Sequence, residues 1–309
     1  MWQKALVILL VLFCLSPYGS APIALALGLV FALTLGNPFP QITGKPATYL
    51  LQASVVMLGF GMNLAAVYKA GKSGIAFIIA VISTALVLGF LLGRLLNIPK
   101  RITTLVSTGT AICGGSAIAA VGPAIKADKD EMSVSLGTIF VLNAVALFAF
   151  PLIGHALDMS QAQFGMWAAI AIQDTSSVVG ASSAYGAEAL TTAATVKLAR
   201  ALWIAPIAIV LAFAFREKDG KATVKIPWFI FLFVLAATIR TFAPNFLWPS
   251  MFDALVNLAK AGFTVTLFLI GLSLSREMLK KVGVRPFLLG AMLWIVIATA
   301  SLFAVLNFV

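Results

Sequence analysis

The sequence predicts an all-α polytopic membrane protein with about 10–11 transmembrane segments, two of which are discontinuous. Of the 309 residues, 61% are hydrophobic and only 10% are charged, whereas about a quarter of a soluble domain is charged. Apolar runs approach the roughly 20 residues that a membrane span needs. Glycine and serine interrupt two of these runs near the middle. Because the runs use up nearly the whole chain, we expect residues 1–309 to form a single integral membrane domain.

Proline, glycine and charged residues separate the apolar runs from one another. The first run could be a signal peptide, but a second run follows at once, so we expect an uncleaved first hairpin. The eleven expected segments are 4–18, 22–36, 47–68, 74–97, 102–125, 132–154, 163–184, 189–215, 226–243, 252–275 and 286–308.

Basic residues in the loops predict the orientation, because cytoplasmic loops are enriched in Lys and Arg. Eleven full crossings with a cytoplasmic N-terminus place 13 basic residues inside and four outside. If segments 102–125 and 163–184 instead enter and return on one side, Lys126 and Lys129 move inside, and the count becomes 15 against two. Both topologies leave the C-terminus outside. The count favours re-entrant segments slightly and leaves both topologies open.

A weak internal echo favours inverted repeats, which are common in secondary transporters. Residues 61–71, with Gly61 and Lys69, resemble residues 271–283, with Gly271 and Lys281. Each stretch closes a span and leads through a short basic turn into another. The two spans run in opposite directions in the expected topology.

Segment 102–125 contains polar and small residues from Thr108 to Ser116, including Thr110, Cys113 and the pair Gly114-Gly115. Paired glycines favour a break in the helix, and a break in the membrane needs a protein or water-filled environment. A half-helix that begins near Gly115 or Ser116 would offer free amides to an anion. Close packing of helices through small residues is the alternative explanation.

Segment 163–184 contains a polar run whose acidic residue, Asp174, lies about ten residues from either end. An acid at that depth is costly and usually faces a bundle interior or water. We therefore expect Asp174 to be a coupling group, with Gln173 beside it, and a buried ion pair is the alternative. The same run supplies candidate substrate-binding residues in Thr175, Ser176 and Ser177.

Segment 189–215 carries Lys197 and Arg200, which are three residues apart and therefore share a helix face. Two cations and one Asp174 leave the site net positive, which suits an anionic substrate. Snorkelling of both side chains to the membrane interface is the alternative. Asn143 is a lesser candidate for amide contacts.

Several other functions lack the residues that they need. The net charge of +11 fits cytoplasmic loops better than a nucleic-acid partner. With one His, no HExxH and no Cys/His cluster, a metal site is not expected, and neither is an enzyme or an ATP-driven pump. Cys14 and Cys113 lie in apolar segments and predict no disulfide.

The run Thr110 to Ala120 resembles the hallmark of the YeiH-type sulfate exporter family. The stretch from Asp174 to Gly180, and the stretch from Lys197 to Arg200 with Pro206, are similar to family features in the same order. The resemblance covers essentially the whole chain. It implies a bacterial inner-membrane protein, remotely related to cation/proton antiporters and bile-acid-type sodium symporters, with inverted repeats and a homodimer as a candidate assembly. Many relatives carry a histidine where this chain has Gln173, which weakens His-assisted proton coupling.

We therefore expect a secondary transporter that exports a small anion, plausibly sulfate, by alternating access. The bilayer and the anionic solute would be its partners, and Na⁺ or H⁺, rather than a bound cofactor, would drive it. The alternatives are a sodium- or proton-coupled carrier of organic anions such as carboxylates, and a membrane scaffold or sensor without transport.

Overall fold

Every element of secondary structure that the structure describes is an α-helix, as the apolar composition predicts. The structure is a computed structural model and describes residues 2–16, 19, 21–39, 43, 45–61, 64–201, 203–215, 229–242, 249–273 and 282–308. Five of the helical stretches in these ranges are long and apolar enough to cross a membrane, and further apolar helices are shorter. The polytopic membrane fold is therefore confirmed.

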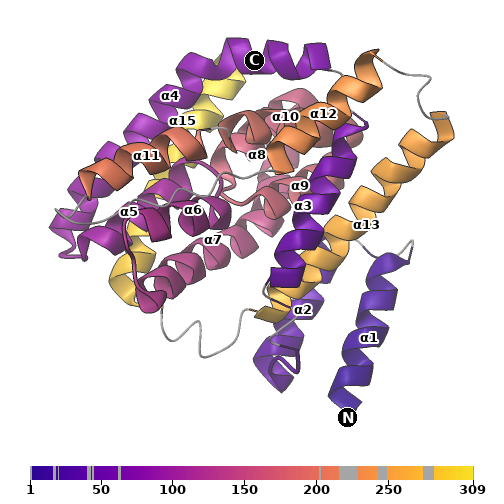
Figure 1. Ribbon diagram of the computed structural model, residues 1–309, viewed down its shortest axis with the longest axis horizontal. Helices are drawn as coiled ribbons and strands as arrows, with labels where there is room; N and C mark the ends of the chain where they lie inside the picture. Colours follow the sequence, from indigo (N-terminus) through magenta and orange to yellow (C-terminus); the bar gives the residue numbers. More distant parts are fainter. Residues whose placement is uncertain are drawn as a thin grey trace.

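The helices follow the expected segments closely (Figure 1). Their bounds are α1 Trp2–Leu15, α2 Ala21–Leu35, α3 Lys45–Gly59, α4 Leu64–Leu95, α5 Lys100–Ala111, α6 Gly115–Ala124, α7 Lys129–Ala156, α8 Gln161–Ala171, α9 Thr175–Tyr185, α10 Ala187–Ala201, α11 Ile204–Ala214, α12 Phe229–Phe242, α13 Pro249–Ser273 and α15 Val284–Phe308.

Two expected boundaries are wrong. The turn between the third and fourth segments lies at Phe60 and Gly61, whose amides bond back to Met57 and Leu58, and α4 already begins at Leu64. Glycine is a poor helix former, so the chain turns there rather than at the basic residues near 70. The segment 189–215 is also divided, because α10 ends at Ala201 and α11 begins at Ile204.

Segment 163–184 is a re-entrant hairpin formed by α8 and α9, named here the second hairpin. The start of α8 lies beside the end of α9, since the rings of Phe164 and Tyr185 stack with centroids 3.8 Å apart. The Tyr185 hydroxyl donates to the Met159 carbonyl (2.6 Å), and Gln161 accepts from the Glu188 amide. Each arm has 11 residues and is about 16 Å long, roughly half the hydrocarbon thickness.

Segment 102–125 likewise folds back on itself, and α5 and α6 form the first hairpin. A Cβ atom on Gly109 would lie 3.1 Å from Cδ1 of Ile118. Nine residues along one continuous helix would instead separate them by about 13 Å. Leu105 of α5 belongs to the same buried apolar cluster as Val121 of α6 and Ile125, which follows directly after α6. Both discontinuous segments therefore fold back on themselves.

The two hairpins open toward opposite ends of α7. The first hairpin leads into the start of α7 at Lys129, and the second hairpin begins at Gln161, soon after α7 ends at Ala156. A helix of 28 residues spans about 42 Å. A unit made of a hairpin and the helical stretch that follows it thus occurs twice, in residues 100–156 and 161–214. The hairpins of the two units point in opposite directions. Part of the expected echo, at residues 62–63 and 274–281, lies outside the described residues.

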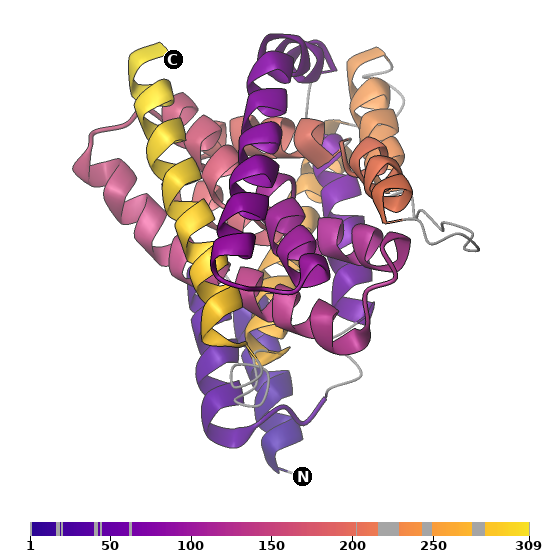
Figure 2. The same cartoon turned by 90° about the vertical axis from the view of Figure 1, so that its left-hand side faces the viewer.

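The helices form two packed groups (Figure 1). Helices α1, α2, α3, α12 and α13 pack mainly on one another, and α4 to α11 pack together with α15. The long helices α4 and α15 lie side by side in Figure 2 and contact α5. The second hairpin links the groups, because α9 contacts both α2 and α13.

Candidate functional site

The first hairpin turns through Ile112, Cys113 and Gly114, named here the first tip. Gly114 has φ +61°, in the left-handed region that favours glycine. It is the N-cap of α6 and, as a glycine, has no side chain to cap that helix end; the Cys113 thiol lies at the backbone amide of Ala117 in the first turn. Ile112, Cys113 and the preceding Ala111 are fully buried, whereas Gly115 and Ser116 are half-buried.

The second hairpin turns through Ile172, Gln173 and Asp174, named here the second tip. Asp174 is 5% exposed and is the N-cap of α9. Its Oδ2 accepts from the amides of Ser176 (3.0 Å) and Ser177 (3.4 Å), and from the Ser176 hydroxyl. The carboxylate therefore lies on the positive end of its own half-helix, where negative charge is stabilised.

The two tips touch. A Cβ atom on Gly114 would lie 3.2 Å from the Cα atom of Asp174. The Gln173 Nε2 donates to the Thr110 hydroxyl across the contact (3.0 Å). From α7, near its middle, Asn143 accepts the backbone amides of Gln173 and Asp174 at 2.9 and 3.1 Å. The sites expected from two distant segments therefore form a single site. The place where the first tip and the second tip touch is named here the crossing point.

Lys197 and Arg200 of α10 are 0% and 1% exposed, respectively, so snorkelling is excluded. Lys197 donates to the Ile172 carbonyl (2.7 Å), at the C-terminal end of α8. Arg200 donates to the carbonyls of Ala169 and Ile170 (both 2.7 Å) and, across the contact, to Ala111 of α5 (2.5 Å). Both cations thus compensate the negative ends of half-helices.

Three polar atoms around the crossing point are buried without a hydrogen-bond partner among the described residues: Asn143 Nδ2, Gln173 Oε1 and Arg200 Nε. Such atoms are unusual, because an unpaired buried polar atom costs about 1–3 kcal/mol. Unpaired polar atoms of this kind are typical of sites that bind water or a ligand.

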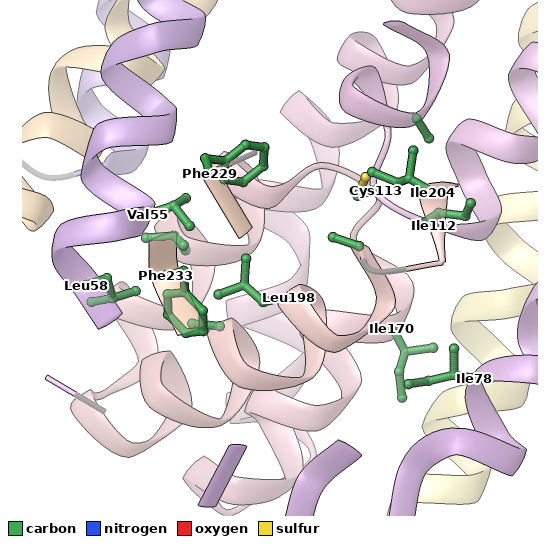
Figure 3. Packing of buried hydrophobic residues seen from close by; sticks show 14 of the residues in the cluster. Val55, Leu58, Ile78, Ile112, Cys113, Ile170, Leu198, Ile204, Phe229 and Phe233 are labelled. Atoms are coloured by element: carbon green, nitrogen blue, oxygen red, sulfur yellow. The ribbon is translucent and has the colours of Figure 1, made fainter. Parts of the chain in front are cut away.

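Apolar side chains surround the first tip on the remaining sides (Figure 3). Ile112 and Cys113 lie beside Ile204 of α11, and Leu198 of α10 lies near Phe233 of α12. The second hairpin is fixed by Trp167, which stacks on Phe150 of α7 (4.2 Å) and donates to the Ala298 carbonyl of α15. Apolar side chains thus pack beside both tips.

The structure brings all the sequence-predicted site residues to the tips or to the α10 face that contacts them. The expected residues are Thr110, Cys113, Gly114, Gly115, Ser116, Gln173, Asp174, Thr175, Ser176, Ser177, Lys197 and Arg200. Their binding roles stay predictions. Sequence reasoning undervalued Asn143, whose depth in a long apolar segment was the available signal. The carbonyls of Ala111, Ala169 and Ile170, which accept from Arg200, could not be predicted from the sequence, because every residue has a backbone carbonyl.

Two re-entrant hairpins that meet inside a helical bundle define a polytopic membrane protein with a buried polar centre. Residues 5–290 match the family model described as "Conserved hypothetical protein 698", and the chain belongs to this family of UPF0324 membrane proteins. It is 52% identical to a UPF0324 membrane protein of Bacteroides thetaiotaomicron over 93% of this chain and 86% of the relative. A Bdellovibrio bacteriovorus relative is 49% identical over 96% and 91%, and a Vibrio vulnificus relative is 47% identical over 94% of each.

No solved structure matches the chain. The names of the relatives state a membrane protein and no substrate.

Proposed function

We propose that the protein is a secondary transporter of a small anion, with sulfate or another sulfur oxyanion as the first candidate. The observation that carries this proposal is the contact between two re-entrant hairpins that open toward opposite ends of α7. Discontinuous helices that meet at mid-depth are the usual substrate sites of secondary transporters, because their free ends can bind ions.

The charges at the crossing point favour an anion. Two half-helix N-termini and two C-termini meet there, each equivalent to roughly half an elementary charge, so these dipoles cancel. With Lys197 and Arg200 protonated and Asp174 ionised, these three buried side chains carry a net charge of +1. A small anion would neutralise this charge, whereas a cation alone would increase it.

Asp174 is the candidate coupling group, because it is the acidic side chain of the second tip. Binding of H⁺ or Na⁺ to its carboxylate would compete with the three donors of α9. This competition would link an ion gradient to the state of the second hairpin. We place the protein in the bacterial inner membrane, with the N-terminus in the cytoplasm.

The test is flux into proteoliposomes that contain the purified full-length protein. Uptake of radiolabelled sulfate is measured under an imposed proton or sodium gradient. Unlabelled sulfite, taurine, bicarbonate and short carboxylates are then added as competitors. We expect saturable, gradient-dependent flux that one of these anions inhibits. Stronger inhibition by carboxylates than by sulfur oxyanions would favour an organic-anion carrier. If no anion moves above the rate of empty liposomes under any gradient, transport is the wrong function.

A further inference from the structure

The carbonyl ends of the half-helices α5 and α8 lie at the crossing point, since α5 ends at Ala111 and α8 ends at Ala171. The last four carbonyls of a helix have no partner within that helix, and they carry partial negative charge. Lipid offers no donor for them. In secondary transporters, carbonyls at such half-helix ends coordinate the coupling ion, Na⁺ or H⁺. These two ends are therefore the places where a coupling cation is expected.

In this chain, two side-chain cations occupy those ends. The Lys197 Nζ donates to the carbonyls of Ile172 (2.7 Å) and Ala169 (3.4 Å). Arg200 also donates to the Ala169 carbonyl and, across the contact, to the Ala111 carbonyl of α5. One guanidinium therefore joins the carbonyl ends of both hairpins, and one ammonium adds further contacts at the end of α8.

Neither cation is neutralised by a carboxylate. In the described part of the chain, Lys197 and Arg200 form hydrogen bonds to backbone carbonyls and no ion pair. The Asp174 carboxylate is bonded to the start of α9 instead. Both cations are at most 1% exposed, and a buried charge is costly unless it is paired or coordinated. Backbone carbonyls thus compensate both charges, as carbonyl oxygens do for a bound metal ion.

We infer that Lys197 and Arg200 take the place of a coupling metal ion. The crossing point of the wild-type protein binds no Na⁺, because side-chain cations already use its carbonyl ligands. Removal of the Lys197 side chain then opens a site for a monovalent cation of ammonium size at the Ile172 and Ala169 carbonyls. This inference rests on the proposed anion transport and selects the proton rather than Na⁺ as its driving ion, with Asp174 as the group that binds it.

The first test is thermal unfolding of the purified full-length protein in detergent, in ammonium, sodium or choline chloride at equal ionic strength. The wild type should melt at the same temperature in all three salts. Lys197→Ala should melt below the wild type in choline, because two buried carbonyls lose a donor. NH₄⁺ should raise the melting temperature of this variant by about 3–5 °C at about a tenfold excess over the dissociation constant.

Lys260→Ala is the matched control for the loss of a lysine, because Lys260 of α13 is exposed. It should respond to the three salts as the wild type does. No effect of NH₄⁺ on Lys197→Ala, or an equal effect on both variants and the wild type, overturns the inference.

The second test needs no variant, so it holds even if Lys197→Ala does not fold. Anion flux into wild-type proteoliposomes is measured under a proton gradient with choline on both sides, and again with Na⁺ in place of choline. We expect equal flux. Flux that requires Na⁺, or uptake driven by a sodium gradient at uniform pH, refutes the inference and leaves the transporter function standing. If no anion moves in any buffer, the proposed function fails, and the melting temperatures still decide whether Lys197 fills a cation site.

Discussion

The replacement Asn143→Leu tests whether one side chain of α7 holds the second tip in place. Asn143 Oδ1 accepts two buried amides, those of Gln173 and Asp174. Leucine has a similar volume and no acceptor, so each amide loses its partner at about 1–3 kcal/mol. The Asn143 Nδ2 has no partner among the described residues. The replacement removes this unpaired buried donor, which stabilises the folded protein and offsets part of the destabilisation. We expect a net destabilisation of about 2–4 kcal/mol.

Thermal unfolding of the purified protein in detergent measures this change. With about 2–4 °C for each kcal/mol, the melting temperature should fall by about 4–16 °C. Asn307→Leu is the matched control, because Asn307 is exposed and donates only to Phe303 of its own helix; it should change stability by less than about 0.5 kcal/mol. Equal melting temperatures of the two variants would refute the role of Asn143 in fixing the tip.

Three further outcomes follow from the geometry of the hairpins. Gly114→Ala should lose about 1–3 kcal/mol, because φ is +61° and the new Cβ atom would lie 3.2 Å from Asp174; a melting temperature equal to that of the wild type would contradict this. Arg200→Lys keeps the charge but not the three-carbonyl contact, so denaturation should show a loss of about 1–3 kcal/mol, and unchanged stability would argue against half-helix capping. Single cysteines at the exposed positions Asp130 and Glu188 should react with a membrane-impermeant maleimide from opposite faces, and labelling from one face would exclude opposed hairpins.

Much of the fold could be predicted from the sequence, because lipid imposes a simple pattern on each segment. The paired glycines at 114–115 and the polar run after Gln173 located both breaks correctly. The return of each hairpin could not be established, since a basic loop at Lys126 that also holds acidic residues gives an ambiguous charge count. Packing contacts between the two arms, such as the stacking of Phe164 on Tyr185, show that the segment returns.

The roles of the two buried cations were harder to predict. Lys197 and Arg200 were expected to bind substrate or to snorkel. Both are buried and contact backbone carbonyls, which excludes snorkelling, and their role in substrate binding stays a prediction. Every residue has such a carbonyl, so no sequence pattern marks the ones left free at the end of α8. The position of Asp174 as the N-cap of its own helix was also missed, although Asp is a preferred N-cap residue.

The contact between Arg200 and the Ala111 carbonyl has a consequence for how the protein is made. Chains emerge from the ribosome N-terminus first, so the first hairpin is synthesised 89 residues before the side chain that completes it. Until α10 arrives, the Ala111 carbonyl needs water or another chain, because lipid offers no donor. A nascent chain that stops before α10 therefore exposes a polar turn in the bilayer. We expect such truncated chains to be recognised and degraded by membrane proteases.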